Sequence, residues 1–110
     1  MSLSLGAIVL NVPDRVRSAA FWSQALAYDP DPGNPDFLGP RNGHGSRIHL
    51  DETDRTHLDL WVDKTISTPD AEVERLTALG AHGVEGWTYP PDADFIVMQA
   101  PDGTTFCIIG

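Results

Sequence analysis

One short segment has three side chains that could bind a ligand or take part in catalysis, at every second position. Residues 57–62 read HLDLWV, in which His57, Asp59 and Trp61 alternate with aliphatic residues. Successive strand residues point to opposite faces, so the aliphatic set should pack on a core and the other three should share the far face. Trp61 could stack on an aromatic ligand or attract a cation, and Asp59 could pair with an amine or act as a general base. The alternative is that His57 is a hydrogen-bonded wall residue, Asp59 a solvated strand residue and Trp61 a packing residue.

Four further side chains are candidates for the same site. Trp87 and Tyr89 precede a Pro-Pro pair and could line a pocket mouth or pack on the surface. Gln99 lies on an expected strand and could point its amide into a cavity. Cys107 is more typical of a small core or cavity residue than of a nucleophile, because free cysteines are commonly buried and inert. The chain contains no G-x-S-x-G, C-x-x-C or H-E-x-x-H motif, so no catalytic residue is identified.

The first half of the chain begins with a strand and a helix. Residues 5–12 are apolar and β-branched and end at Pro13, which indicates a strand. Asp14 can then cap a helix, which has to end before the proline- and glycine-rich residues 29–33. The apolar stripe of this helix is Val16, Ala19, Trp22 and Leu26. A loop-rich stretch follows over residues 29–45, with a short strand at Phe37-Leu38, a turn at Asn42-Gly43 and a strand at 46–50.

The second half repeats this order. After the strand at 57–62, Thr68 can cap a helix with Pro69 in its first turn, and Gly80 is the expected C-terminal glycine. Its buried stripe is Val73, Leu76 and Leu79. Three strands should follow, at about residues 83–89, 95–100 and 104–109, the last two joined by a Pro-Asp-Gly turn.

A weak internal repeat therefore organises the chain. Residues 7–12 align with residues 57–62, and each of these strands leads into a helix. We expect a single domain over residues 1–110 with an α+β fold, in which one module covers about 1–51 and the other about 56–110.

Composition limits the function classes. The 110 residues are 41% hydrophobic and 21% charged, which is typical of a globular domain. The net charge of -9 and the absence of a basic stripe argue against binding to nucleic acid or to an anionic membrane. The N-terminus lacks a secretory pattern, and no apolar run approaches about 18 residues. A single cysteine fits a reducing compartment, so we expect a cytoplasmic protein.

Three segments, in the right order, resemble one known superfamily. NVPDRVRSAAFWSQAL looks like its first strand and helix, HLDLWVDK like the opening strand of its second module, and MQAPDGTTFCII like its closing hairpin. The chain thus resembles the vicinal oxygen chelate superfamily of glyoxalases, bleomycin-resistance proteins and dioxygenases, and is most similar to its short glyoxalase-like subgroup. The resemblance implies two βαβββ modules that form a cupped half-barrel sheet with helices on the outside.

The resemblance also implies positions for metal ligands, which this chain fills poorly. The first-strand position falls on Ala7, which cannot bind a metal, and the last-strand position falls on Cys107, where metal-dependent members carry Glu. The second-module position falls on His57. His49 is the one candidate for the remaining position, although alternation places it opposite Ile48, which would rather be buried. We therefore expect neither a metal nor another cofactor.

Three functions follow as hypotheses. The first is a metal-free protein that binds a small aromatic or cationic molecule, as in antibiotic sequestration or self-resistance, in a groove shared by a homodimer. The second is a divalent-metal-dependent lyase, isomerase or dioxygenase of the same fold. The third is a metal-independent enzyme of small-molecule metabolism that uses Asp59, His57 or Cys107 as acid, base or nucleophile.

Overall fold

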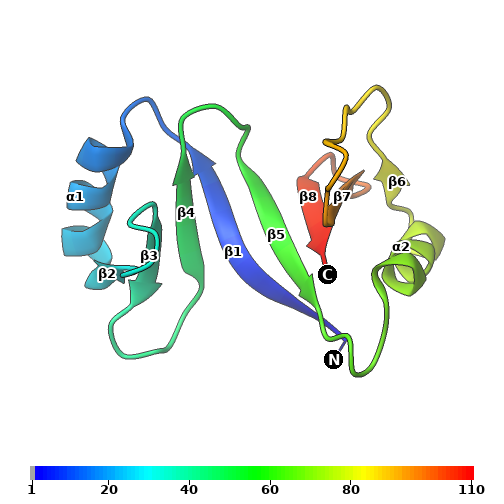
Figure 1. Cartoon of the computed structure of the whole chain (residues 1–110), viewed down its shortest axis with the longest axis horizontal. Coiled ribbons are helices and arrows are strands. Elements are labelled where there is room, and N and C mark those ends of the chain that lie inside the picture. The colour runs from blue at the N-terminus through cyan, green and yellow to red at the C-terminus, as the bar shows by residue number, and fades with distance from the viewer. Residues whose placement is uncertain (1) are drawn as a thin grey trace. The chain divides into compact units, whose positions relative to one another are not determined.

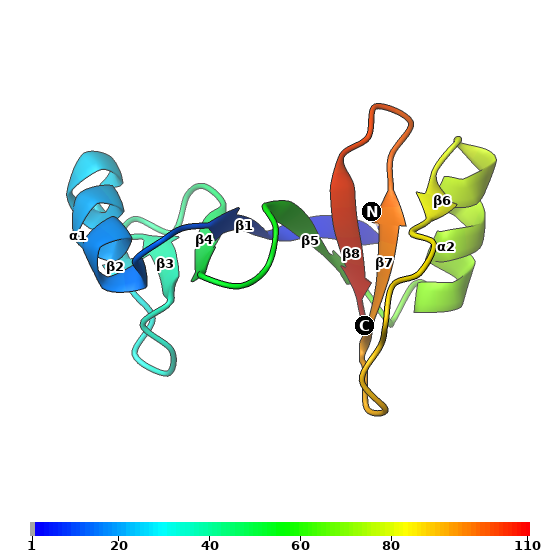
Figure 2. The ribbon, with the colours of Figure 1, turned by 90° about the horizontal axis from the view of Figure 1, so that it is seen from above.

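The computed structural model describes residues 2–110 and divides into two compact units. The N-terminal unit is Gly6–Thr56, and the C-terminal unit is His57–Gly110 together with the described residues up to Leu5. Each unit follows the order strand, helix and three strands (Figure 1). Each helix lies against one side of the strands of its own unit (Figure 2). The expected α+β class with two βαβββ modules is confirmed.

The N-terminal unit is built on one parallel strand pair. Its sheet order is β2-β3-β4-β1, with β1 parallel to β4 and the other pairs antiparallel. Its core consists of Val12, Leu38, Ile48 and Leu50. Its elements are β1 (Leu3–Asn11), whose residues up to Leu5 belong to the C-terminal unit, α1 (Arg15–Leu26), β2 (Tyr28–Pro30), β3 (Phe37–Pro40) and β4 (Arg47–Asp51).

Helix α1 has the expected start but buries less of its surface than expected. The Asp14 side chain accepts a hydrogen bond from the backbone N–H of Arg17 at 3.1 Å, which is an N-cap. Ala19 and Trp22 pack against the core of the unit. The predicted stripe is wrong at its two ends, Val16 and Leu26, which are exposed because the helix touches its core only through its middle turns.

Strand β2 was not predicted, because its sequence, Tyr-Asp-Pro, leads into the proline-rich loop. Pro30 pairs with Leu38 of β3 at the end of the sheet order. Proline has no N–H to donate to a ladder, so it is tolerated on an edge strand.

The C-terminal unit repeats the pattern around a second parallel pair. Its sheet order is β5-β8-β7-β6, with β5 parallel to β8 and the remaining pairs antiparallel. Ala81, Met98, Phe106 and Ile108 form its core. Its elements are β5 (His57–Val62), α2 (Pro69–Ala78), β6 (His82–Gly83), β7 (Phe95–Gln99) and β8 (Thr105–Ile109).

Helix α2 is delimited by the expected residues. Thr68 accepts a hydrogen bond from the N–H of Ala71, and Gly80 ends the helix at φ 105°, a conformation that suits glycine. Val73 and Leu76 pack against the core. The predicted stripe is wrong at Leu79, which is 67% exposed because the chain already turns away there.

The most deeply buried residue of α2 is a carboxylate. Glu72 is 2% exposed and accepts hydrogen bonds from the hydroxyls of Ser2 and Ser67 and from the guanidinium of Arg75. The Arg75 hydrogen bonds and then the Ser2 hydrogen bond lower the pKa of Glu72. A buried charge needs such partners, so this carboxylate ties the N-terminal segment to the helix.

The strand predicted at about 83–89 is wrong beyond its first residue. Strand β6 ends at Gly83, and Gly86, at φ 77°, and the Pro-Pro pair interrupt further pairing. The outer edge of β7 is instead capped by a side chain: the hydroxyl of Tyr89 accepts a hydrogen bond from the N–H of Val97 at 2.8 Å.

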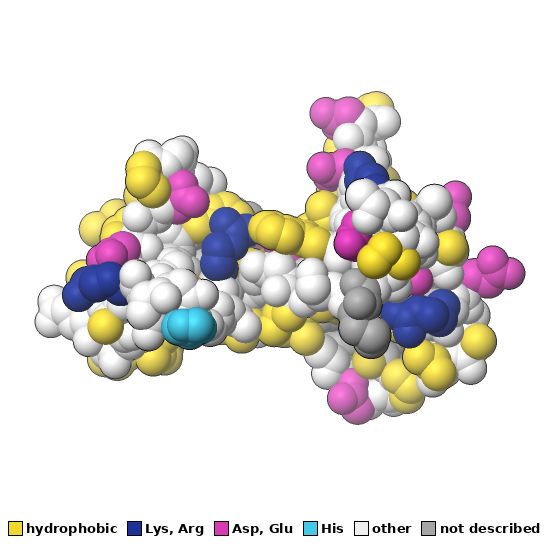
Figure 3. All heavy atoms as spheres, turned by 90° about the horizontal axis from the view of Figure 1, so that it is seen from below, with side chains coloured by type: hydrophobic (Ala, Val, Ile, Leu, Met, Phe, Trp, Pro, Cys, Tyr) yellow, Lys and Arg dark blue, Asp and Glu magenta, His cyan; other side chains and the backbone are white. Residues whose placement is uncertain are grey.

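The surface agrees with the acidic composition. Figure 3 shows the Lys and Arg side chains of one face as a few isolated spots rather than a basic patch. No helix in residues 2–110 is long and apolar enough to cross a membrane.

Candidate ligand-binding face

Strand β5 separates its side chains as its alternation predicts. Leu58, Leu60 and Val62 pack against the core cluster that contains Phe106 and Ile108. His57, Asp59 and Trp61 alternate with them and therefore lie on the opposite side of the strand. The predicted division of β5 into an aliphatic and a chemically capable face is confirmed.

Strand pairing brings a cysteine beside the carboxylate. Asp59 is the Cα partner of Cys107 across β5 and β8, and Cys107 is the partner of Val97 across β8 and β7. Partners in register share a face of a sheet, so these three side chains form one row. We call the side of the sheet that carries this row the β5–β8–β7 face.

The next row on this face is apolar and aromatic. Trp61 is the partner of Ile109, which is in turn the partner of Phe95. The ring of Tyr89 extends the row, with its centroid 5.6 Å from that of Phe95. Trp61 is 44% exposed, so part of its surface is open to solvent.

The polar end of the face is compact and poorly hydrated. His57 Nε2 lies 3.2 Å from Asp59 Oδ1, and their side chains are only 7% and 15% exposed. One donor atom each from His57, Asp59 and Cys107 lies within 4.8 Å of the other two. Cys107 is buried and not in a disulfide. An imidazole, a carboxylate and a thiol thus converge at one point of the sheet.

The other predicted site residues are placed less centrally. Gln99 lies on β7 opposite the buried Thr105, one row beyond Cys107. Trp87 lies in the segment between β6 and β7, where its backbone N–H bonds to the carbonyl of Val84. Tyr89 is held to β7 by its hydroxyl, as described above.

His49 belongs to a different environment. It lies on β4 of the N-terminal unit and stacks on Phe37, with ring centroids 4.1 Å apart and planes 7° apart. Arg47 lies over the same phenyl ring, at 4.7 Å. Ile48 is buried, as expected from alternation. The four-ligand set implied by the resemblance does not fit, because Ala7 has no donor.

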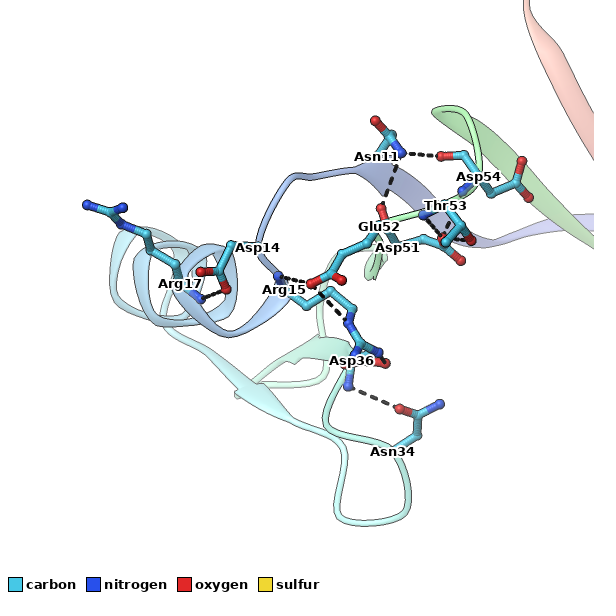
Figure 4. Close-up of polar contacts among 10 residues, drawn as sticks. All are labelled: Asn11, Asp14, Arg15, Arg17, Asn34, Asp36, Asp51, Glu52, Thr53 and Asp54. Carbon is cyan, nitrogen blue, oxygen red and sulfur yellow. Dashed lines mark hydrogen bonds and ion pairs between the residues drawn. The ribbon is translucent and has the colours of Figure 1, made fainter.

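The N-terminal unit contains a second polar cluster, which the sequence analysis did not identify. Arg15 Nη1 lies 2.6 Å from Asp36 Oδ2, and its Nε lies 3.4 Å from Glu52 Oε2 (Figure 4). Asp51 accepts hydrogen bonds from the backbone N–H groups of Asp54 and Thr53, which lower its pKa. The carboxylates are already bound by protein donors, which fits a role in loop structure rather than ligand binding. They border a cavity of about 240 Å³ lined by Arg15, Asp36, His49, Leu50, Asp51, Glu52 and Thr53.

The fold and this face define a protein of two βαβββ units with a candidate small-molecule site on a sheet. The chain belongs to the glyoxalase-like domain family, whose model matches residues 7–109, and thus to the vicinal oxygen chelate superfamily. No protein of curated function matches the sequence.

Solved structures share the fold at low sequence identity. A structure described as NAD-dependent benzaldehyde dehydrogenase from Legionella pneumophila is 16% identical, with a TM-score of 0.64, and the match covers 94% of this chain and 96% of that one. Methylmalonyl-CoA epimerase from Mycobacterium tuberculosis is 18% identical, with a TM-score of 0.59 and coverage of 96% and 85%. At these identities the likeness concerns the fold alone.

Proposed function

We propose that this protein binds a small planar aromatic or cationic molecule on the β5–β8–β7 face. The observation that carries the proposal is the exposed indole of Trp61 on the same side of β5 as Asp59. A planar ligand on Trp61 would lie along the row that Ile109 and Phe95 continue. Stacking on such a ring contributes about 0.5–1.5 kcal/mol beyond area burial.

Asp59 adds a preference for positive charge. Its side chain is only 15% exposed, and its attraction to a ligand cation is therefore weakly screened by solvent. Loss of one partner of such a desolvated charge pair costs about 2–5 kcal/mol. The net charge of -9 would also attract a cation from solution. Sequestration of an aromatic, cationic antibiotic is the biological use we propose for this site.

The second candidate is a divalent-metal-dependent lyase, isomerase or dioxygenase. It is favoured by the convergence of His57, Asp59 and Cys107 within 4.8 Å. Turnover of a small carbonyl or aromatic substrate that stops on addition of a chelator would support it over simple binding. The binding proposal needs no metal.

The binding proposal is tested with two ligands that differ in charge. Tryptophan fluorescence is titrated with the cationic dye ethidium and with uncharged phenanthridine, in the presence of a chelator. Trp61→Phe should reduce quenching and weaken binding of both ligands by roughly twofold, because the phenyl ring keeps part of the stacking. Trp22→Phe, at a position packed against the core of the N-terminal unit, is the matched control and should leave the affinities unchanged.

Asp59→Asn should remove the preference for ethidium over phenanthridine and leave phenanthridine binding nearly unchanged. Saturable quenching that persists unaltered in both Trp61→Phe and Asp59→Asn would reject the β5–β8–β7 face as the site.

A further inference from the structure

The turn between β3 and β4 contains an asparagine and a glycine whose groups can react with each other. Asn42 is one of three asparagines in the chain, and it alone is followed by glycine. We propose that Asn42 is a self-modification site, where the amide is converted in water, through a cyclic succinimide with Gly43, into aspartate or isoaspartate. This inference is independent of the small-molecule proposal, because the turn belongs to the N-terminal unit.

The reaction needs only the chain and water. The backbone nitrogen of Gly43 attacks Cγ of Asn42 and loses its proton to solvent, and the side-chain nitrogen takes up a proton and leaves as ammonia. Water then opens the ring. Breaking the new bond to Cγ gives aspartate, and breaking the original main-chain bond gives isoaspartate, in which the backbone runs through the side chain. The net change consumes one water, releases one ammonia and replaces a neutral amide by a carboxylate.

The turn holds the side-chain amide in a suitable state for this attack. The backbone N–H of His44 donates a hydrogen bond to Oδ1 of Asn42 at 3.0 Å. Negative charge develops on this oxygen when the nitrogen of Gly43 adds to Cγ, and a donor already aimed at the oxygen stabilises the intermediate. The same bond keeps the side-chain carbonyl close to the backbone that follows Asn42, from which the attack comes.

Gly43 supplies an unhindered nitrogen. It has no Cβ, its φ is 76°, and a Cβ built there would meet no atom within 4 Å. Its N–H donates to the carbonyl of Pro40 at 3.0 Å, and this hydrogen bond has to open before the nitrogen can attack. Residues 41–45 are all exposed, so water replaces the bond and the opening costs little free energy.

The other two asparagines lack these features. Asn34 precedes Pro35, whose nitrogen has no proton to lose. Asn11 precedes the buried, β-branched Val12, which crowds the nitrogen, and its own amide donates a 2.6 Å hydrogen bond to the carbonyl of Asp54. Among the asparagines, the reaction should therefore be confined to Asn42.

The Asp-Gly pair of the other unit could form the same ring, but charge protects it. Asp102 accepts a hydrogen bond from the backbone N–H of Thr104 at 2.9 Å, and the hydrogen bonds from Thr104 lower the pKa of Asp102. Its carboxyl is therefore ionised at neutral pH, and a carboxylate is a poor target for a nucleophile. The neutral amide makes Asn42 the reactive member of the two turns.

The product changes the charge around one cavity. Asn42 lines a cavity of about 340 Å³ together with Arg41, His44 and four other residues. A carboxylate at position 42 would give Arg41 a second acidic neighbour besides Asp29, whose Oδ1 lies 2.9 Å from the guanidinium. It would also add one negative charge to the net charge of -9, so anion exchange should separate the modified chain from the original.

The test follows Asn42 in the folded full chain. The protein is incubated in heavy-oxygen water at mildly alkaline pH and digested, and the peptide that contains residue 42 is analysed by liquid chromatography and mass spectrometry. We expect both aspartate and isoaspartate at this position, each with one heavy oxygen from solvent. Asn42 should convert at least roughly tenfold faster than Asn11 or Asn34, since only its amide has a correctly placed nucleophile.

Two variants and one control assign the reacting groups. Asn42→Gln should abolish the conversion over the same period, because the longer side chain would have to close a larger ring. Gly43→Ala should slow it by on the order of tenfold, because the added methyl group hinders the attacking nitrogen. Asn34→Gln, in another exposed loop, should leave the rate at Asn42 unchanged. Circular dichroism confirms that each variant is folded.

Conversion of Asn11 or Asn34 as fast as that of Asn42 would overturn the proposal. A product that contains aspartate alone would also overturn it, because direct hydrolysis of the amide would then bypass the ring. So would a conversion that begins only after unfolding in urea, because the folded turn would then protect the amide. None of these results bears on ethidium binding, which is measured on the C-terminal unit.

Discussion

The division of β5 into two faces predicts opposite phenotypes for two neighbouring residues. Leu60→Ala should destabilise the protein and leave ligand binding intact, whereas Trp61→Ala should weaken binding and leave the protein folded. Leu60 is the register partner of Ile108, which is fully buried, and packs against the core of the C-terminal unit. Trp61 is 44% exposed on the other side of the strand.

The magnitudes follow from burial. Truncating a core leucine to alanine costs about 2–5 kcal/mol, and Leu60 should lie near the lower end because it is only half-buried. Substitutions at exposed positions usually change stability by about 0.5 kcal/mol, and the larger contact area of an indole raises the expectation for Trp61→Ala to roughly 1 kcal/mol. The two variants should therefore differ by at least about 1 kcal/mol in free energy of unfolding.

Urea denaturation followed by circular dichroism measures this difference as a shift in midpoint at unchanged slope. Ethidium titration of the same two variants measures the binding side. If Trp61→Ala unfolded the protein while Leu60→Ala was silent, the faces of β5 would be reversed. The recognition role of the Trp61 row would then be lost.

Three other substitutions test how the second helix and its turn are built. Gly80→Ala should lower the free energy of unfolding by about 1 kcal/mol or more in a urea melt. Gly80 has a φ of 105°, and an added Cβ would lie 3.0 Å from Pro101. Gly83→Ala is the control, because a Cβ there would meet open space. Thr68→Ala removes the helix cap and should cost about 1 kcal/mol in the same assay. Because the pKa of Glu72 is lowered in the folded protein, its carboxylate stabilises the fold above the ordinary pKa, and this stability is lost as pH falls through the lowered value. Glu72→Gln should therefore lower the thermal midpoint at neutral pH and make the midpoint less dependent on pH below about pH 4.5. A variant whose midpoint depends on pH as that of the unaltered protein does would contradict the role assigned to the buried carboxylate.

Local signals in the sequence predicted the elements well. The caps at Asp14 and Thr68, the glycine at the end of α2 and the alternation over 57–62 each depend on residues within a few positions of one another. Such patterns act through backbone dihedrals and short-range hydrogen bonds, so they can be read without knowledge of the fold.

What the sequence could not supply depends on pairing between distant segments. Asp59 and Cys107 become neighbours only through the parallel register of β5 and β8, which no local pattern specifies. Glu72 likewise accepts a hydrogen bond from Ser2, which lies 70 residues away along the chain. The alternation of residues 57–62 predicted which side of β5 holds the polar and aromatic side chains. The pairing of β5 with β8 determines which residues of the other strand lie beside them.

The two candidate functions, binding of an aromatic cation and metal-dependent chemistry, share Asp59, and this makes a further prediction. A metal bound to Asp59, His57 and Cys107 would neutralise the carboxylate that favours a cationic ligand. Zn²⁺ should therefore weaken ethidium binding and leave phenanthridine binding nearly unchanged, because only ethidium depends on the charge of Asp59. Linkage requires the reverse effect of equal size, so saturating ethidium should weaken Zn²⁺ binding by the same factor. Calorimetric titration of each ligand with and without the other measures both factors. Equal affinity of ethidium with and without bound Zn²⁺ would show that the organic cation and the metal do not both use this carboxylate.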